Sequence, residues 1–509
     1  MIAIKLKVNL IAQLLTGLLR TKYFVVIAEV FLMTILALSS FSILVRLTDV
    51  KTIGFWVLLN SLLSFSKVAD FWSAGLVTFV AEDVERGEKE RASRLVSTSM
   101  LTAAFGFLVI VLGVGVALMV FAAHIPGVED AALVRSVVPL MCVTFWFSTV
   151  AATYHVGFLG FNRPLLKLLQ NVGGSLMFLV LSLALVPHYG LWGILLAQAV
   201  QGFLMLGFGI LVFHGVMTKT SPLSWSRADF KQLTRYGSKA SVVGFLQLAC
   251  DPLIRVLASY FGGLAAVTLI ELATRMIVAV RGLIMSVGQL LVPTFARASL
   301  QDQSETAKLY GSARQIFIVV TVPVLAGLLC LAPLLELVML VKPTPEFIPM
   351  MWMLSVGWGV NIITAPAFFL LTGRRRLRPL FWNRLLMLLS VLIFGALGGQ
   401  FFGILGVTFG VTIGLVSASL LVFHAAREFE TFDGKWSKFG LRPQWLTPLP
   451  LALLSNVIFL YMAHAGFSMW LLVLVTALGL LATASVVLAN FPHNLLNHSS
   501  VVNPDLQKS

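Results

Sequence analysis

Fourteen long apolar stretches follow one another along the chain, with only short polar segments between them. The hydrocarbon core of a bilayer is about 30 Å thick, and an α-helix of roughly 20 apolar residues spans it. Of the 509 residues, 59% are hydrophobic and only 11% are charged, whereas soluble globular proteins carry about 25% charged residues. These features exclude a soluble enzyme, a disordered protein and a soluble solenoid. They predict an all-α polytopic membrane protein with about 14 transmembrane helices.

The apolar stretches also predict how the chain is organised. We expect transmembrane helices at residues 24–47, 52–80, 95–123, 137–158, 168–186, 191–213, 240–261, 264–292, 316–335, 348–371, 380–397, 404–423, 449–463 and 470–490. Two six-helix lobes would then occupy 24–214 and 240–424, with two further helices in 448–490. Cytoplasmic linkers would lie at 215–239 and 425–447, an amphipathic N-terminal helix at 1–23 and a cytoplasmic tail at 491–509.

The positions of the cations predict the orientation of the chain. Short cytoplasmic loops accumulate Lys and Arg, and the chain carries 36 such residues against 21 Asp and Glu. With the N-terminus inside, the outside loops hold only Arg46, Lys51, Arg135 and Lys342. Both termini are therefore expected on the cytoplasmic side. The net charge of +15 follows mainly from this topology, so no nucleic-acid partner is expected.

Glycines recur at a constant distance in the two predicted lobes. Gly160, Gly190 and Gly193 each have a counterpart 213 positions later, at Gly373, Gly403 and Gly406, and Arg376 follows Arg163 by the same distance. Secondary transporters are commonly built from such internal repeats. Both halves have the same helix order and loop charges, which predicts parallel repeats. Recurrence of glycine in helix-ending loops by chance is the alternative explanation.

Charged residues within the predicted spans are candidates for function, because each costs about 2.5 to 3.5 kcal/mol to insert. They are Glu29, Lys67, Asp70, Asp251, Arg255, Glu271, Arg275, Arg281, Glu336 and Arg384, with Arg46 near an outer helix end. Helical spacing would pair Asp251 with Arg255, Glu271 with Arg275 and Lys67 with Asp70. These pairs are as readily explained by neutralisation during insertion as by function. Arg384 lies near a cytoplasmic helix end, where snorkelling would explain it equally well.

The seventh and eighth predicted helices, at 240–261 and 264–292, carry three arginines and two acidic residues. Arg255, Arg275 and Arg281 outnumber Asp251 and Glu271, and we expect them to face a substrate cavity between the repeats. The planar guanidinium can bind phosphate oxygens in a bidentate way and keeps its proton. An excess of arginine in a cavity therefore predicts an anionic substrate. A cation exporter would be expected to leave carboxylates in excess.

No cofactor or metal site is expected from the sequence. The three cysteines, Cys142, Cys250 and Cys330, lie apart within apolar stretches and lack the spacing of a metal site. The chain also lacks a Walker-type phosphate-binding loop. Transport would then be driven by Na⁺, by H⁺ or by the membrane potential.

Several short motifs resemble one family of transporters. Leu44-Val45-Arg46-Leu47 with Gly54-Phe55-Trp56, then Phe261-Gly262-Gly263 and Glu271-Leu272-Ala273-Thr274-Arg275-Met276, occur in the order seen in that family. They resemble the polysaccharide flippases of the MOP exporter superfamily, both the Wzx-like translocases and the MurJ-like lipid II flippases. The resemblance covers roughly the first twelve helices, and fourteen spans fit the MurJ-like proteins better.

The resemblance implies a function and a set of site residues. The cargo would be an undecaprenyl-pyrophosphate-linked oligosaccharide, moved to the outer leaflet by alternating access for cell-surface polysaccharide synthesis. Arg46, Arg275 and, less closely, Arg255 match cavity arginines of the MurJ-like proteins. With Arg281, we expect these residues to contact the pyrophosphate. We expect gating or ion coupling from Glu29, Lys67, Asp70, Asp251 and Glu271.

The resemblance also implies a location and partners. We expect a multi-pass protein of the bacterial inner membrane, in contact with membrane lipids, with a polysaccharide polymerase and glycosyltransferases as candidate partners. The alternative function is a MATE-like antiporter for small organic cations. A membrane-embedded glycosyltransferase would need large outside loops, and the longest one here, residues 124–136, carries too few catalytic side chains. We therefore expect a transporter and not an enzyme.

Overall fold

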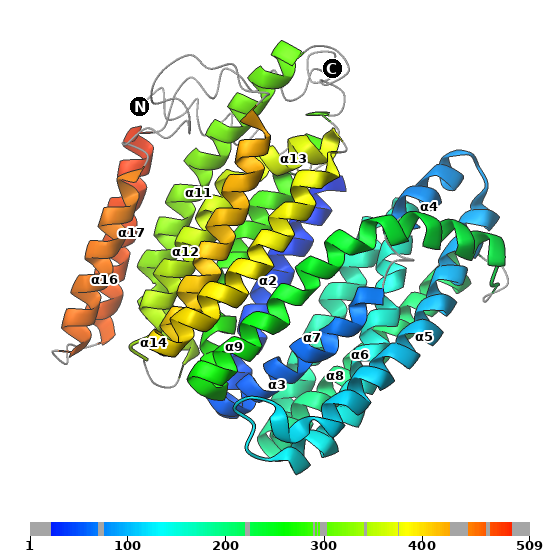
Figure 1. Ribbon diagram of the computed structural model, residues 1–509, viewed down its shortest axis with the longest axis horizontal. Helices are drawn as coiled ribbons and strands as arrows, with labels where there is room; N and C mark the ends of the chain where they lie inside the picture. The colour runs from blue at the N-terminus through cyan, green and yellow to red at the C-terminus, as the bar shows by residue number, and fades with distance from the viewer. Residues whose placement is uncertain are drawn as a thin grey trace. The chain divides into compact units, whose positions relative to one another are not determined.

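The computed structural model describes residues 22–69, 76–218, 224–288, 291–292, 294–295, 303–340, 344–374, 376–427, 446–464 and 469–490. Within these ranges the chain is almost entirely helical and contains no β-strand. The helices, drawn in Figure 1, are α2 (Lys22–Leu47), α3 (Val50–Leu63), η1 (Ser64–Ala69), α4 (Leu76–Glu85), α5 (Lys89–Val120), η2 (Ala122–His124), α6 (Ala131–Gly160), α7 (Pro164–Tyr189), α8 (Leu191–Ile210), η3 (Leu211–Thr218), α9 (Arg227–Gly288), α11 (Gln303–Met339), α12 (Phe347–Ile363), α13 (Ala365–Gly373), α14 (Leu377–Ala425), α16 (Pro448–His464) and α17 (Met469–Asn490).

Where the structure describes it, each predicted apolar stretch coincides with one of these helices, a part of one, or neighbouring short helices. Within the described residues, nine helices are long and apolar enough to cross a membrane. This number is below fourteen partly because α9 and α14 each contain two predicted spans, and because α3, α4 and α16 are individually short. In α17, the apolar part Leu471–Val487 is also too short to be counted. The prediction of an all-α polytopic membrane protein is confirmed.

Polar side chains at helix starts explain several of the observed boundaries. The carboxylate of Asp130 accepts hydrogen bonds from the backbone N–H groups of Ala132 at 2.8 Å and Leu133 at 3.1 Å, and α6 begins directly after it. Asp49 caps α3 in the same way by accepting from Thr52 N at 2.8 Å. A capping carboxylate satisfies N–H groups that have no partner within the helix. Pro164 begins α7, where a missing N–H does no harm.

Two of the repeated glycines have nearly the same backbone conformation. Gly190, between α7 and α8, has φ 53° and ψ −125°, and Gly403, which breaks α14, has φ 56° and ψ −134°. Only glycine adopts this region without strain. The helices that precede these breaks begin at Pro164 and Leu377, again 213 positions apart. The predicted repeat therefore reappears as equivalent local structure, which chance recurrence of glycine does not explain.

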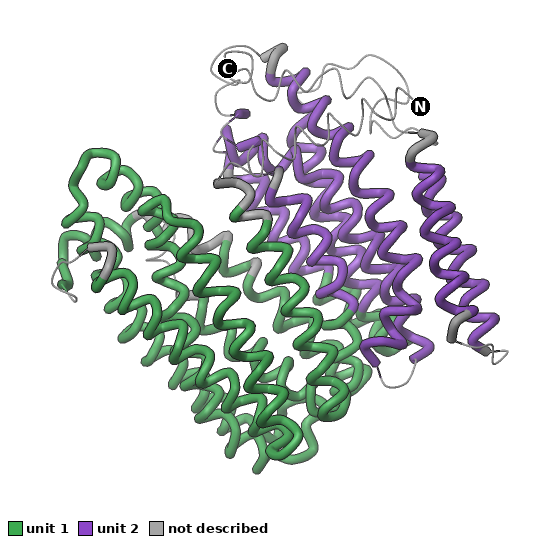
Figure 2. Tube along the Cα trace, turned by 180° about the vertical axis from the view of Figure 1, so that it is seen from behind, with its two compact units in different colours: residues 1–272, 391–407 green, residues 273–390, 408–509 purple. Residues whose placement is uncertain are grey.

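The chain divides into two compact units, coloured separately in Figure 2. Unit 1 comprises residues 1–272 and 391–407, and unit 2 comprises residues 273–390 and 408–509. The helical break at Gly263, with φ 71°, turns α9 back on itself within unit 1. This break confirms that Phe261-Gly262-Gly263 ends a span. The lobe and linker boundaries expected from the sequence stay predictions.

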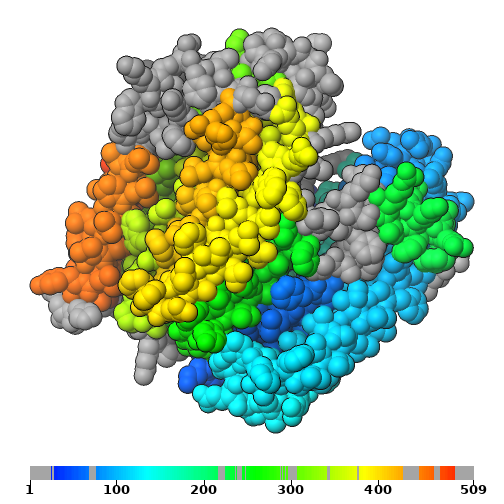
Figure 3. Space-filling view, in the orientation of Figure 1, coloured from blue at the N-terminus to red at the C-terminus, as the bar shows by residue number. Residues whose placement is uncertain are grey.

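The last two helices present an apolar surface to their surroundings. In unit 2, α16 and α17 pack on each other and on α11, and Figure 3 shows α16 as the orange strip beside α11. Their outer faces expose Leu453, Tyr461, Leu478 and Leu481. Such a surface would promote aggregation in water but suits a helix in contact with lipid.

Some predicted features lie outside the described residues. They include residues 1–21 of the expected amphipathic helix, the expected tail at 491–509, most of the linker at 425–447 and Asp70.

Candidate functional site

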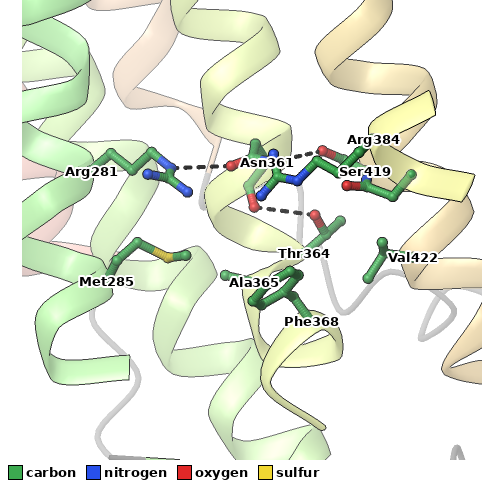
Figure 4. Close-up of a pocket in the computed structure, with 10 residues that line it drawn as sticks. Arg281, Met285, Asn361, Thr364, Ala365, Phe368, Arg384, Ser419 and Val422 are labelled. Carbon is green, nitrogen blue, oxygen red and sulfur yellow. Dashed lines mark hydrogen bonds between the residues drawn. The ribbon is translucent and has the colours of Figure 1, made fainter. Parts of the chain in front are cut away.

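A cavity within unit 2 is lined by residues of α9, α12, α13 and α14 and by Thr364, between α12 and α13 (Figure 4). Its lining consists of Arg281, Met285, Asn361, Thr364, Ala365, Phe368, Asn383, Arg384, Ser419 and Val422. None of these lining residues, all of which the structure describes, is Asp or Glu. The described lining residues therefore give the cavity a positive charge.

Arg281 is held by an amide and an indole ring. Its Nε donates a hydrogen bond to Oδ1 of Asn361 at 3.2 Å, and its guanidinium carbon lies 5.1 Å from the centroid of the Trp358 ring. Asn361 in turn donates from Nδ2 to Oγ of Ser419 at 3.1 Å. No ion pair joins Arg281 to a carboxylate of the described residues. Its charge is thus not neutralised by an acid within this part of the chain.

Arg384 and two asparagines belong to the cavity although the sequence did not assign them to it. Figure 4 shows the Arg281 and Arg384 side chains approaching Asn361 from opposite sides, Arg281 from α9 and Arg384 from α14. Snorkelling to the membrane surface was one explanation expected for Arg384; in the structure its side chain lines the cavity. Asn361 and Asn383 could have indicated this cavity from the sequence, because an amide inside an apolar span is costly unless it is hydrogen-bonded.

Arg255, in unit 1, makes a strong ion pair with Glu271. Its Nε and Nη2 both donate to Oε2 of Glu271, at 3.0 and 2.7 Å. Asp251 lies 4.0 Å from Nη1, as helical spacing predicts, but is itself exposed. Arg255 and Glu271 stand eight residues on either side of the break at Gly263, and the hairpin brings them together. The sequence predicts an excess of positive charge in the spans at 240–261 and 264–292. Because Arg255 is paired with Glu271, it does not contribute to that excess.

Glu29 is buried and has two partners on another helix. Its Oε1 accepts a hydrogen bond from Nδ2 of Asn171 at 2.6 Å and lies 3.2 Å from Nζ of Lys167. Glu29 belongs to α2, and both partners belong to α7. The sequence offers Glu29 no partner on its own helix, and the structure shows that it is paired between helices.

The remaining predicted site residues are placed individually. Arg46 is exposed in the last turn of α2. Lys67, in η1, is exposed, and its ammonium lies 5.2 Å from the centroid of the Phe145 ring. Arg275 is half-buried on α9 in unit 2. Of the four arginines expected to contact pyrophosphate, Arg281 is the one that lines the cavity of unit 2.

The chain is similar to one protein family over nearly half its length. Residues 73–299 match the family of polysaccharide biosynthesis proteins. No curated protein sequence matches the chain significantly.

Solved structures share the fold over most of the chain. The lipid II flippase MurJ, in an inward closed conformation, aligns with a TM-score of 0.66 and 14% identity, covering 90% of this chain and 97% of MurJ. An inward-facing multidrug resistance MATE family transporter of the MOP superfamily aligns with a TM-score of 0.58 and 16% identity, covering 80% and 98%.

A third solved structure also shares the fold. A MOP superfamily transporter from Pyrococcus furiosus, whose binding pocket is described as having reverse polarity, aligns with a TM-score of 0.56 and 14% identity, covering 79% of this chain and 94% of that one. Identities this low establish the fold alone. Together with the family match, they confirm the resemblance predicted from the sequence motifs. The chain is a polytopic membrane protein with the fold of the MOP superfamily transporters, and its residues 73–299 match the polysaccharide biosynthesis protein family.

Proposed function

We propose that this protein flips an undecaprenyl-pyrophosphate-linked oligosaccharide from the cytoplasmic to the outer leaflet by alternating access. The observation that carries the proposal is the charge of the unit 2 cavity, where Arg281 and Arg384 line the wall and no described lining residue is acidic. A basic wall attracts an anion such as pyrophosphate. The match of residues 73–299 to polysaccharide biosynthesis proteins supports a saccharide cargo.

The physical task is to move a charged, hydrophilic headgroup across about 30 Å of hydrocarbon. Guanidinium groups offset the loss of water around the pyrophosphate, while the polyprenyl tail stays in lipid. An inside-negative membrane potential favours the outward movement of an anion. At about 2.3 kcal/mol per charge per 100 mV, a headgroup of roughly two negative charges gains about 4 to 5 kcal/mol, which is enough to drive the step without ATP.

The proposed roles of individual residues are those expected from the sequence. Arg46, Arg275 and Arg281 are proposed to contact the pyrophosphate. Arg255 can do so only by sharing its guanidinium with Glu271, to which it donates two hydrogen bonds. The carboxylates and the lysine proposed for gating or coupling to Na⁺ or H⁺ are Glu29, Lys67, Asp70, Asp251 and Glu271. No cofactor enters this mechanism.

The competing function is a MATE-like antiporter for small organic cations, which the fold similarity to a MATE transporter also supports. The two functions require opposite charge in the cavity. A cation site needs a carboxylate, and the described lining residues of the unit 2 cavity supply guanidinium, amide, hydroxyl and apolar groups. The polarity of the cavity therefore favours the flippase.

The proposed function also implies a location and partners. The protein would reside in the bacterial inner membrane with both termini in the cytoplasm, in contact with membrane lipids. Glycosyltransferases would act before it, and a polysaccharide polymerase after it, on the same lipid-linked saccharide.

The proposal is tested in cells that depend on this protein. Arg281→Ala and Arg275→Ala variants should reduce the lipid-linked saccharide that reaches the outer leaflet, with protein levels unchanged, and the lipid-linked precursor should build up inside. Arg378→Ala, which removes an exposed arginine near the start of α14, serves as a control. Normal flux in both the Arg281→Ala and the Arg275→Ala variants would contradict the proposal.

A further inference from the structure

We infer that the unit 2 cavity is a binding site for a single phosphate group. The guanidinium groups of Arg281 and Arg384 bind the phosphate, and Asn361 positions Arg281. The inference rests on the proposed function, because it names the part of the cargo that this cavity binds. It also adds Arg384 and Asn361 to the residues expected from the sequence.

The first observation is that Arg281 is fixed before any ligand arrives. Its Nε is used by Oδ1 of Asn361, and Trp358 lies against the guanidinium. Among the described residues, its two terminal amino groups donate no hydrogen bond to the protein, so they can donate to a ligand. A guanidinium offers five donors in a planar fork, and a fork held in place loses less entropy on binding an oxyanion.

The second observation is that Asn361 links both walls of the cavity. Its Oδ1 accepts from Arg281 on α9, and its Nδ2 donates to Ser419 on α14 at 3.1 Å. Both ends of the amide are thereby used, and its orientation is determined. An amide in this position holds the guanidinium without neutralising it, which a carboxylate of the same shape would do.

The third observation is that a second guanidinium faces the same space. Arg384 lines the cavity from α14, and its side chain lies opposite that of Arg281 in Figure 4. Two like charges that share a partly apolar cavity repel one another. An oxyanion between them removes this repulsion and can accept from both forks, whereas an organic cation would add to it.

The fourth observation is a helix start at the cavity. α12 ends at Ile363, and α13 begins at Ala365, with Pro366 in its first turn. Thr364 and Ala365 both line the cavity. The N-terminus of a helix carries partial positive charge, and interrupted transmembrane helices often bind anionic groups of a substrate in this way. Here, however, Ala367 N and Phe368 N both donate to the Thr364 carbonyl, and α12 ends where α13 begins, so the attraction for an anion comes from the two arginines.

The lining also indicates the size and chemistry of the ligand. Met285, Phe368 and Val422 contribute apolar surface, which strengthens charge-assisted hydrogen bonds by limiting access of water. The charged donors come from the guanidinium groups of Arg281 and Arg384, which suit the oxygens of a phosphate group. The saccharide would need hydroxyl-binding groups over a longer surface.

The site is tested by isothermal titration of the purified full-length protein in detergent with inorganic phosphate, inorganic pyrophosphate and undecaprenyl pyrophosphate. We expect inorganic phosphate and pyrophosphate to bind, and Arg281→Ala and Arg384→Ala each to weaken the binding of both by about tenfold or more, as the loss of a charged hydrogen bond predicts. Arg378→Ala, an exposed arginine of the same helix as Arg384, should leave binding unchanged.

Asn361 is tested by an isosteric pair of substitutions. Asn361→Asp places a carboxylate on Arg281 and should abolish binding, while Asn361→Leu should weaken it by about tenfold. A merely structural role would instead make Asn361→Asp the better tolerated of the two for anion binding. Because a variant can fail to fold, the melting temperature of each is measured first. Arg384→Lys, which keeps the positive charge but loses the planar guanidinium, is a milder test of the role of Arg384.

The outcomes separate the site from the proposed function. Absence of pyrophosphate binding by the wild type, or equal weakening by Arg378→Ala and Arg281→Ala, would overturn the site even if flipping persists. Binding that follows the expected order without flipping of a lipid-linked saccharide would leave the site standing and reject the proposed function. Binding of inorganic pyrophosphate with none of the lipid form would support a phosphate site that serves a free anion.

Discussion

Arg255 and Glu271 face each other across a helical hairpin, with Nη2 of the arginine 2.7 Å from Oε2 of the glutamate. The arginine side chain is 19% exposed and the glutamate 8%, so the pair is largely removed from solvent. Breaking such a pair leaves one charge uncompensated, whereas replacing both partners is often tolerated.

This geometry predicts the effect of single and double substitutions. Glu271→Gln or Arg255→Met alone should destabilise the protein by about 3 kcal/mol, and the double substitution Arg255→Met with Glu271→Met should recover most of the loss. Thermal unfolding in detergent measures this. A double variant as unstable as the single ones would mean that the two side chains do not stabilise the fold as a pair.

The equivalent glycines 190 and 403 predict a matched pair of stability effects. Gly190→Ala and Gly403→Ala should each destabilise the protein by about 1 to 3 kcal/mol, because their positive φ strains any other residue. Gly207, inside α8 with open space around it, is the control. Gly207→Ala should be neutral or stabilising by up to about 1 kcal/mol, as melting temperatures in detergent would show.

Unequal responses at the two glycines would contradict the structural repeat. If Gly403→Ala were as harmless as Gly207→Ala, the break in α14 would not need the conformation seen at Gly190.

Asp83, at the end of α4, predicts a pH dependence. Burial raises the pKa of this carboxyl above its ordinary value of 3.8, and Arg91, at 3.6 Å, opposes the shift. A folded state with the higher pKa binds the proton more tightly, so Asp83 favours folding as the pH falls through the window above 3.8. Asp83→Asn should therefore be more stable than wild type at pH 7.

That advantage of Asp83→Asn should shrink as the pH is lowered toward 4. Melting temperatures of both proteins between pH 7 and pH 4 measure it. A constant difference across this range would show that the carboxyl titrates as an exposed one does.

Glu29 predicts a change in energy coupling. If its carboxylate exchanges H⁺ during transport, Glu29→Gln should leave flipping measurable but insensitive to an imposed pH gradient. Lys167→Arg keeps a cation opposite Glu29 and should retain the sensitivity. Reconstituted vesicles with and without a pH gradient distinguish the two, and a Glu29→Gln protein that still responds to the gradient would remove Glu29 from the coupling mechanism.

The sequence was informative where the bilayer or a single turn constrains the chain. Helix positions could be predicted because hydrocarbon thickness sets the length of an apolar span, and the break at Gly263 because glycine permits a positive φ. The contact of Arg255 with Glu271 was within reach, since both lie eight residues from that break. Helical spacing alone suggested Arg275 as the partner of Glu271 instead.

Contacts between distant helices could not be predicted. Glu29 meets Lys167 and Asn171 because α2 packs on α7, and nothing in the spacing of one helix indicates which helix will pack against it. For the same reason, Arg384 could not be assigned to the cavity of Arg281. Single-helix patterns report which residues share a face, whereas a site depends on which faces meet.

The charge of the cargo is the central question, and transport by purified protein in proteoliposomes answers it most directly. Vesicles that contain both an undecaprenyl-pyrophosphate-linked saccharide and a small organic cation allow the two substrates to be followed together. We predict that the lipid-linked saccharide changes leaflet, faster when the potential favours movement of the anion, that Arg281→Ala slows it, and that the organic cation stays in place. Exchange of the organic cation, with the saccharide remaining in its original leaflet, would contradict the account.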